Sequence, residues 1–323
     1  MESRLKIGTR GSSLALAQAG LVEKALRREF PGLETEIVIL HTKGDLVQDK
    51  PLSQVGQKGV FVSEFETALL EGRIDLAVHS AKDLPVRLAE GLDILTVLPR
   101  ADVRDALVLP AGRNGAFADA REAFASWPEG NVIGTGSLRR QLYGKRLAPG
   151  ASFRLIRGNV DTRLKKLEAG EYDGIILAGA GLERLGILER EKERFAFLPI
   201  PEELFLPAAC QGIIAVEGRC SLELRPVMER LDDRMTRLAF ETERRALWRF
   251  GADCSAPAAA YCRIQESGGR ETMKLTVMYA GRERSGEASV QERFALADAL
   301  CEEVRKTDEK KSDGDRSGTG REM

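Results

Sequence analysis

The chain has 323 residues and a mass of 35.5 kDa, which suggests two or three domains at about 150 residues each. Its 49 Lys and Arg and 50 Asp and Glu leave a formal net charge of −1. This balance disfavours a dedicated nucleic-acid-binding protein, which usually carries a basic surplus. Neither a membrane helix of ~20 apolar residues nor an apolar signal core is visible. Five scattered cysteines indicate reduced, cytosolic thiols, and two histidines argue against a His-rich metal site.

The first hundred residues predict alternating strands and helices. Apolar runs indicate strands at residues 5–8, 36–40, 74–78 and 92–98. Helical spacing of apolar residues after residue 13 involves Leu14, Ala17, Leu21 and Ala25. A second helix is expected around Phe61, Phe65 and Leu69. Between them, the polar stretch 42–59 is too long for a tight turn, and such loops are usually functional or disordered.

The pattern restarts near Asp105. Strands are expected at 131–134, 153–156 and 174–178, with helices starting near Ser137, Asp161 and Gly181. Alternation of this kind predicts an α/β architecture with largely parallel sheets. A further strand at 212–217 is expected to return to the first sheet, which makes the first domain discontinuous.

The character of the chain changes after residue 230. A charged helix at 234–250, strands at 258–265 and 274–280, and a final helix predict a small α+β unit. The polar tail contains too few large apolar residues to order itself. We therefore expect a first domain at 1–103 and 207–230, a second at 104–206, a third at 231–307 and a disordered tail at 308–323.

A glycine-bearing turn follows the expected strand at 131–134 and opens the next helix. In the run VIGTGSLRRQ, Ser137 can cap that helix, and Arg139 and Arg140 fall in its first turn. Backbone N–H groups and the helix dipole attract an anion at such a position, whereas cations are unfavourable there unless an anion compensates them. The alternative interpretation is a capped helix with solvent-facing arginines.

Basic residues are concentrated around this turn. Residues 131–166 contain nine Lys or Arg and one acidic residue, Asp161, which gives a local charge of 9 − 1 = +8. A charge run is usually a solvated face. Here, however, the arginines lie at strand ends and helix starts, where ligand sites of α/β proteins are found. Because arginine binds carboxylates and phosphates bidentately, we expect a polyanionic ligand.

Three other segments carry candidate chemistry. Arg10 and Ser12 follow the first strand, and Lys82 and Asp83 follow the strand at 74–78. These side chains suit carboxylate binding and, for Asp83, proton transfer, although a surface ion pair or a simple serine cap is the alternative. Cys254 lies in a loop without a histidine nearby for a Cys–His pair.

The ordered strings KIGTRGSSLAL, VGQKGVF, DLAVHSAKDLP, VIGTGSLRRQ, RGNVDTRLKKLEAGEYDGIILAGAGLERLG, LPAACQGIIAVE and ADCSAP resemble the porphobilinogen deaminase family from about Leu5 to Lys306. The resemblance implies two periplasmic-binding-protein-like α/β domains flanking a cleft, plus a small α+β C-terminal domain. It also implies one dipyrromethane cofactor per chain, covalently bound through a thioether to Cys254. The implied activity is that of a transferase of tetrapyrrole (porphyrin) biosynthesis, hydroxymethylbilane synthase.

In the implied reaction, four porphobilinogen molecules condense head to tail with loss of ammonia, and water releases hydroxymethylbilane. Each ring carries an acetate and a propionate, so the site needs many cations. Asp83 matches the catalytic aspartate, which would protonate the leaving amine and stabilise cationic intermediates. The resemblance assigns the binding of substrate and cofactor carboxylates to Arg10, Ser12, Lys58, Lys82, Thr135, Ser137, Arg139, Arg140, Arg157, Arg163, Arg184 and Gln211. Gln54 stands where many members have another loop lysine.

On this interpretation the partner is the small molecule porphobilinogen, without nucleic acid, membrane or metal, and the protein is a cytoplasmic monomer. Two other classes stay open on the residues alone. Two α/β lobes around a cleft also suit a non-enzymatic carboxylate-binding protein, although Cys254 and the third domain then lack an explanation. A nucleic-acid site at residues 131–166 has little aromatic interleaving, with only Tyr143 and Phe153.

Overall fold

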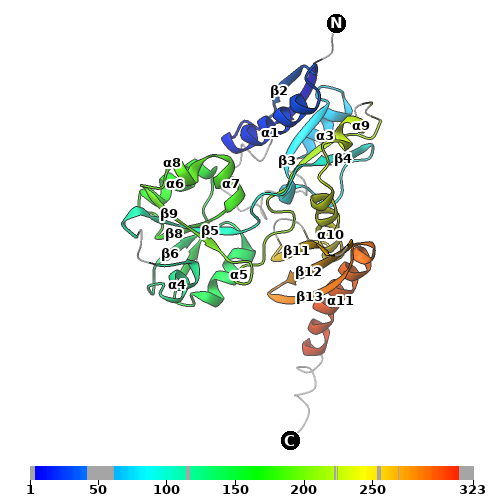
Figure 1. The fold of residues 1–323 in the computed structure, drawn as a ribbon. Helices are drawn as coiled ribbons and strands as arrows, with labels where there is room; N and C mark the ends of the chain where they lie inside the picture. The colour runs from blue at the N-terminus through cyan, green and yellow to red at the C-terminus, as the bar shows by residue number, and fades with distance from the viewer. Residues whose placement is uncertain are drawn as a thin grey trace, which may run out of the picture.

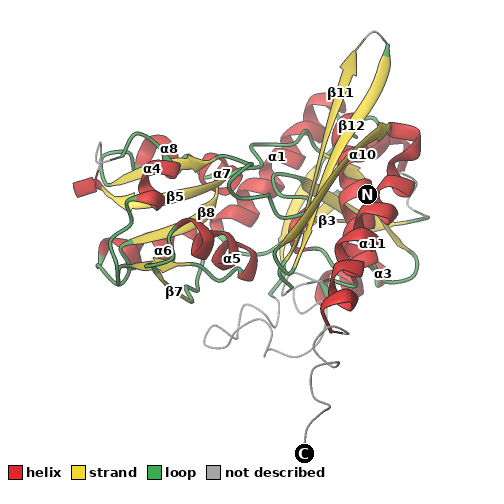
Figure 2. Ribbon diagram, turned by 90° about the horizontal axis from the view of Figure 1, so that it is seen from below, coloured by secondary structure: helices red, strands yellow, loops and turns green. Residues whose placement is uncertain are grey.

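The protein is represented by a computed structural model, which describes residues 4–41, 62–113, 117–221, 223, 225–252, 256–267 and 269–312. Three β-sheets organise these residues into a first lobe, a second lobe and a third unit (Figure 1). Seen from below, the second lobe lies to one side of the other two (Figure 2). In the described part of the chain, no helix is long and apolar enough to cross a membrane.

The first lobe is built on a five-stranded sheet, in spatial order β2 (Thr35–Ile39), β1 (Leu5–Thr9), β3 (Leu76–Ser80), β10 (Ile214–Arg219) and β4 (Leu92–Val97). Successive side chains of a strand point to opposite faces. Leu76 and Val78 therefore pack with helices α1 (Ser13–Glu29) and α9 (Arg225–Glu229), whereas Ala77 packs with α3 (Ser63–Leu70).

The second lobe repeats this arrangement with the order β7 (Ser152–Arg154), β6 (Val132–Gly134), β8 (Gly174–Ala178), β5 (Asp105–Pro110) and β9 (Phe195–Ile200). Leu107 and Leu109 of β5 face the helices α4 (Ala120–Ala125) and α5 (Leu138–Leu147). Ala106 and Val108 face the other layer, which consists of α6 (Val160–Glu168), α7 (Gly179–Arg184) and α8 (Ile187–Arg190).

The third unit is a three-stranded antiparallel sheet, β11 (Ala258–Ser267), β12 (Arg270–Tyr279) and β13 (Arg282–Ser289). It packs against α10 (Arg234–Phe250) and α11 (Arg293–Ser312). Ala259 and Met278 also belong to the hydrophobic cluster that forms the helix-covered core of the second lobe around α4 and α5. The expected helix at 234–250 is confirmed, and it ends at Gly251 in the left-handed conformation that favours glycine.

The expectation of largely parallel sheets is only half right. In the first lobe β1 pairs with β2 and β3 in parallel, but β10 is antiparallel to both β3 and β4. In the second lobe β5 is antiparallel to β8 and β9. The reason is topological, because β5 and β10 are the strands with which the chain enters each lobe from the other. The expected return of a strand near 212–217 to the first sheet is confirmed by β10.

Two chain segments connect the lobes and lie side by side. The first crossover (residues 98–104) is joined by backbone hydrogen bonds to the second crossover (residues 201–213) and to the start of β10: Ala101 N donates to Gly212 O and Leu98 N to Ile214 O, both at 3.1 Å. Gly212 has φ +87°, and a Cβ there would lie 2.6 Å from the oxygen of Ala101. Only glycine therefore fits the close contact between the two crossovers.

Several predicted details were wrong. The buried face of α1 contains Gln18, Ala19, Val22 and Leu26, whereas Leu21 is 42% exposed. Because Gln18 is polar, the spacing of apolar residues in the sequence does not identify this buried face. The Gln18 side chain hydrogen-bonds to Ser80. The strands β5, β9 and β13 were not predicted as strands. Helix α11 continues to Ser312, past the boundary at 308 where the tail was expected to begin, and residues 313–323 lie outside the described part.

Candidate active site

Three strand-to-helix turns place capped helix N-termini at the carboxyl ends of parallel strands. At the start of α1, the Ser12 hydroxyl accepts the N–H of Ala15 at 3.3 Å, and at the start of α5, Ser137 accepts that of Arg140 at 3.4 Å. Asn159 caps α6 in the same way. Each N-terminus presents positive partial charge to an anion. Both serines keep a hydroxyl proton to donate.

Three predicted ligands support or flank these turns. Thr135 is fully buried, and its hydroxyl accepts the N–H of Ser137 at 3.2 Å. Its hydroxyl shapes the turn at the start of α5. Arg10 lies in the first turn and Arg157 in the third, and both side chains are partly buried. The three turns thus combine positively charged side chains with polar backbone groups.

The expected catalytic pair follows β3 as a single 3₁₀ turn, η2 (Ala81–Asp83). The Lys82 ammonium donates to the side-chain oxygen of Gln211 at 3.2 Å, while Asp83 is exposed. Arg244 of α10 donates to the carbonyl oxygens of Pro85 and Val86, each at 2.8 Å. The third unit therefore holds the backbone that follows Asp83.

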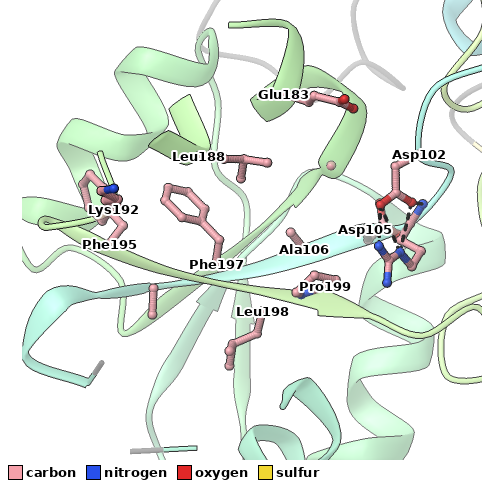
Figure 3. Close-up of a pocket in the computed structure, with 13 residues that line it drawn as sticks. Asp102, Asp105, Ala106, Glu183, Leu188, Lys192, Phe195, Phe197, Leu198 and Pro199 are labelled. Atoms are coloured by element: carbon pink, nitrogen blue, oxygen red, sulfur yellow. Dashed lines mark hydrogen bonds and ion pairs between the residues drawn. The ribbon is translucent and has the colours of Figure 1, made fainter. Parts of the chain in front are cut away.

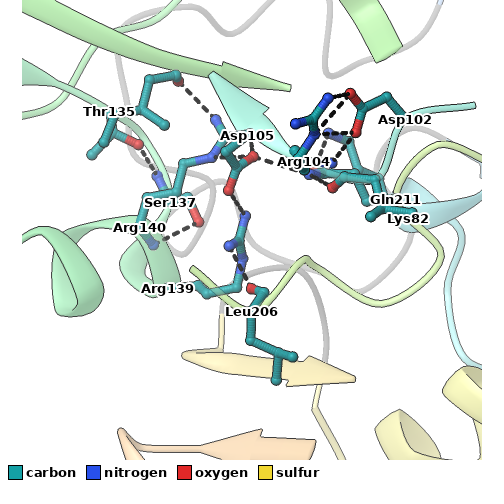
Figure 4. Close-up of polar contacts among 12 residues, drawn as sticks. Lys82, Asp102, Arg104, Asp105, Thr135, Ser137, Arg139, Arg140, Leu206 and Gln211 are labelled. Atoms are coloured by element: carbon teal, nitrogen blue, oxygen red, sulfur yellow. Dashed lines mark hydrogen bonds and ion pairs between the residues drawn. The ribbon is translucent and has the colours of Figure 1, made fainter. Parts of the chain in front are cut away.

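Arg139 and Arg140 have a different first partner from the ligand we expected. Both are buried, and both donate to the carboxylate of Asp105, each with a 2.7 Å contact (Figure 4). Their other hydrogen bonds go to the backbone oxygens of Leu206 and Ile176, respectively. Burial alone would raise the pKa of Asp105, but the charges of the two arginines and their hydrogen bonds hold it well below its usual range. This carboxylate compensates the cations that open α5.

Gln211, another expected ligand, has hydrogen-bond partners within the protein. Its side chain is buried, and the amide already contacts Lys82, Val103 and Asp105. Arg184, another expected ligand, donates to the backbone oxygen of Gly212 at 2.5 Å. Arg184 thus binds the backbone of the second crossover, and Gln211, which belongs to that crossover, binds groups of neighbouring segments.

Asp83 of the first lobe influences the pKa of both Lys82, its neighbour in the chain, and Arg163 of the second lobe. Burial lowers the pKa of Lys82 to about 8, Asp83 opposes this shift, and the charge of Arg140 adds to it. Burial also lowers the pKa of Arg163 to about 10, with Arg140 and Arg157 acting in the same direction and Asp83 against it. Burial lowers the pKa of Arg184 as well. An anion at this junction would restabilise the charged forms of these side chains.

Arg163 differs from Arg139 and Arg140, which form ion pairs with Asp105. Its Nε donates to the backbone oxygen of Gly158 at 2.8 Å, and no carboxylate of the described residues forms an ion pair with it. Lys58 and Cys254, and the departure at Gln54, lie outside the described residues. Within the described ranges, no group of three or more His, Cys, Asp or Glu is placed to hold a metal ion.

Sequence reasoning missed two buried carboxylates. Asp105 begins the apolar strand β5, and an acid at the start of the run DALVLP was the available signal. Glu243 is fully buried in α10 and pairs bidentately with Arg100 of the first crossover. It also accepts the backbone N–H groups of Cys210 and Cys262. Nothing in the charged pattern of α10 distinguishes Glu243 from its solvated neighbours.

A cavity of about 510 Å³ lies elsewhere in the second lobe (Figure 3). Its walls come from the first crossover, α7, α8 and β9, and include Leu188, Phe197 and Pro199. It shares Asp105 with the site described above, but none of the predicted ligands lines it. We therefore place the candidate site at the turns and not in this cavity.

The fold and the site define a class of protein: two α/β lobes and a third unit, with capped helices, cations and the exposed Asp83 carboxylate near the junction of the lobes. Residues 5–224 match the family described as "Porphobilinogen deaminase, dipyromethane cofactor binding domain". The chain belongs to the porphobilinogen deaminase family, as the sequence motifs indicated.

Curated relatives match nearly the whole chain. "Porphobilinogen deaminase" of Roseiflexus castenholzii is 41% identical over 311 residues, covering 94% of this chain and 96% of its own. The protein of that name from Geobacter sulfurreducens is 41% identical and covers 94% and 89%. That of Streptococcus sanguinis is 42% identical over 265 residues, covering 82% and 83%.

Solved structures with similar architecture are more distant in sequence. An ancestral cationic amino acid solute-binding protein is 15% identical, with a TM-score of 0.44, covering 75% of this chain and 93% of its own. The periplasmic VFT2 domain of BvgS from Bordetella pertussis is 13% identical, with a TM-score of 0.41, covering 70% and 86%.

Proposed function

We propose that this protein is a hydroxymethylbilane synthase, a transferase of porphyrin biosynthesis. It would condense four porphobilinogen molecules head to tail with loss of ammonia and release hydroxymethylbilane by hydrolysis. The observation that carries the proposal is the juxtaposition of the exposed Asp83 carboxylate with Lys82 and Arg163, two cations whose pKa values burial lowers. A substrate with several carboxylates and a cationic leaving group complements this arrangement.

The position of each side chain determines the role that we propose for it. Asp83 would transfer a proton to the leaving amine and stabilise positive charge that develops nearby. Lys82, Arg163, Arg10 and Arg157 bind substrate carboxylates, with the hydroxyls of Ser12 and Ser137 as further donors. Arg139 and Arg140, held by Asp105, supply positive potential from behind α5, and Thr135, Arg184 and Gln211 support the backbone or the ligand side chains.

The described residues fit the dipyrromethane group that the family description names. The cations Lys82, Arg163 and Arg184 have pKa values lowered by burial, and the acetates and propionates of such a group would reverse that cost. We propose that Cys254 anchors it as a thioether and that Lys58 contributes to its binding. When bound, the group supplies the primer on which the substrate chain is built.

Incubation of the purified protein with porphobilinogen tests the function. We expect release of ammonia with formation of a linear tetrapyrrole. A protein that only binds carboxylates would take up porphobilinogen without releasing ammonia, and that result would reject the enzymatic proposal. Binding to DNA or RNA that weakens steeply with salt would instead support the nucleic-acid alternative.

Mass spectrometry of the active protein checks the anchor. We expect a covalent adduct of two pyrrole rings on the peptide that contains Cys254, and none on peptides containing Cys210 or Cys301. A Cys254→Ala variant should lack the adduct and the activity. An unmodified Cys254 thiol in fully active protein would contradict the proposed attachment.

We also propose domain boundaries, an oligomeric state and a cellular location for the protein. We assign a first domain to residues 1–103 and 207–230, a second to 104–206 and a third to 231–307, supported by the membership of β10 in the first sheet. The protein would act as a cytoplasmic monomer on a small molecule, without nucleic acid. Sedimentation equilibrium should give the 35.5 kDa mass of one chain, and a mass near twice that value would contradict the monomer.

A further inference from the structure

The side-chain amide of Gln211 connects the two lobes through its three polar contacts. Its oxygen accepts the Lys82 ammonium of the first lobe at 3.2 Å. Its nitrogen donates to the backbone oxygen of Val103 at 2.7 Å and to the Asp105 carboxylate of the second lobe at 3.0 Å (Figure 4). The side chain is only 1% exposed, so water does not compete for these contacts.

The orientation of this amide is determined by its partners. Val103 and Asp105 both present oxygens, which only the NH₂ end of the amide can satisfy. The carbonyl end must therefore face Lys82. The backbone of Gln211 is also held, because its oxygen accepts Nε of Arg100 at 2.9 Å and its N–H donates to Ala208 at 3.0 Å.

Lys82 depends on this fixed oxygen. A lysine side chain has a flexible four-carbon stem, so its ammonium needs a partner to hold one position. Among the described residues, Gln211 is the acceptor that the structure gives it. The charged groups that influence the ammonium are Asp83 next to it in the chain and Arg139, Arg140 and Asp105 of the second lobe.

We propose that Gln211 is a positioning residue, whose amide, oriented by Asp105 and Val103, holds the Lys82 ammonium beside Asp83 for the incoming carboxylate. A neutral acceptor suits this task because it orients the ammonium without cancelling its charge. A carboxylate at the same place would neutralise Lys82 and repel Asp105. The catalytic meaning of this inference rests on the proposed function, whereas the orientation of Lys82 does not.

Two substitutions separate positioning from simple packing. Gln211→Met keeps the volume and removes the acceptor, and Gln211→Glu keeps an acceptor but adds a negative charge. Gln18→Met is the matched control, because Gln18 is an equally buried glutamine whose amide bonds Ser80 and not Lys82. Thermal melting confirms that each variant is folded before the other measurements.

The main readout is the titration of Lys82 itself, followed by trace acetylation at increasing pH with mass spectrometry of the Lys82 peptide. The wild-type midpoint, measured at the same cofactor content as each variant, is the reference. Gln211→Met should move the midpoint to lower pH, because the buried ammonium loses its acceptor. Gln211→Glu should move it to higher pH, and Gln18→Met should leave it unchanged.

Kinetics give the second readout. In both Gln211 variants we expect kcat/KM for porphobilinogen to fall on the order of tenfold or more, with KM raised, while Gln18→Met stays near wild type. Wild-type titration of Lys82 in both folded Gln211 variants would overturn the inference. If the wild type releases no ammonia but the Lys82 midpoints shift as stated, the proposed function fails and the positioning role stands.

Discussion

Asp83→Asn is expected to fold like the wild type and to lower kcat by about 10²–10⁴-fold, the usual contribution of a general acid–base group. The substitution preserves shape but removes both the transferable proton and the negative charge. Asp83 is exposed and is not part of the packed core, so its loss should leave the midpoint of urea unfolding unchanged. Ammonia release under single-turnover conditions measures the effect on the chemical steps.

Asp93→Asn provides the matched control for this experiment. Asp93 is an aspartate of the same lobe that pairs at the surface with Arg225 at 2.9 Å. Its replacement removes one surface carboxylate and one ion pair that involves neither Lys82 nor Arg163, and its turnover should stay within a factor of about two of wild type. Turnover of Asp83→Asn near the wild-type rate would show that another group transfers the proton.

The sequence motifs predicted where this site lies better than how its side chains are used. Ser137 caps its helix as expected, and Ser12 caps α1, which was the alternative left open for it, because a cap depends on residues only three positions apart. The partner of Arg139 and Arg140 lies 34 and 35 residues earlier in the chain, at Asp105. No local pattern identifies such a long-range partner, so two arginines that read as free ligands are committed to a buried carboxylate.

The same limit applies to the fold. The alternation of strands and helices predicted α/β lobes, but strand direction depends on how the chain enters each sheet. The antiparallel strands β5 and β10 follow the two crossovers, whose contact requires Gly212 and the hydrogen bonds around Gln211. Local periodicity contains no information about these contacts. The motif LPAACQG, which contains Gln211 and Gly212, indicated only that this segment matters to the family resemblance.

Asp105→Asn should be the most destabilising single substitution at the site. It leaves the buried guanidinium groups of Arg139 and Arg140 without their compensating charge. Breaking a buried ion pair from one side costs about 3–5 kcal/mol. We expect a loss of that size in the free energy of unfolding at neutral pH, measured by urea denaturation, together with loss of activity because the start of α5 would rearrange.

The pH dependence of this loss distinguishes an ion pair from a packing defect. The arginines hold the folded-state pKa of Asp105 well below its usual range. The resulting stabilisation is complete above the unfolded-state pKa of about 4 and is lost as the pH falls toward the folded-state value. The difference between wild type and Asp105→Asn should therefore shrink below about pH 4, whereas a packing defect would persist there.

Asp102→Asn is the appropriate comparison, because Asp102 also pairs with an arginine, Arg104, at 2.7 Å. Its side chain is 34% exposed, against 0% for Asp105. Exposed ion pairs contribute at most about 1 kcal/mol, because water and salt screen them. The two aspartates lie three positions apart in the first crossover and β5, so equal losses in the two variants would attribute the effect to the local backbone and not to the buried charge of Asp105.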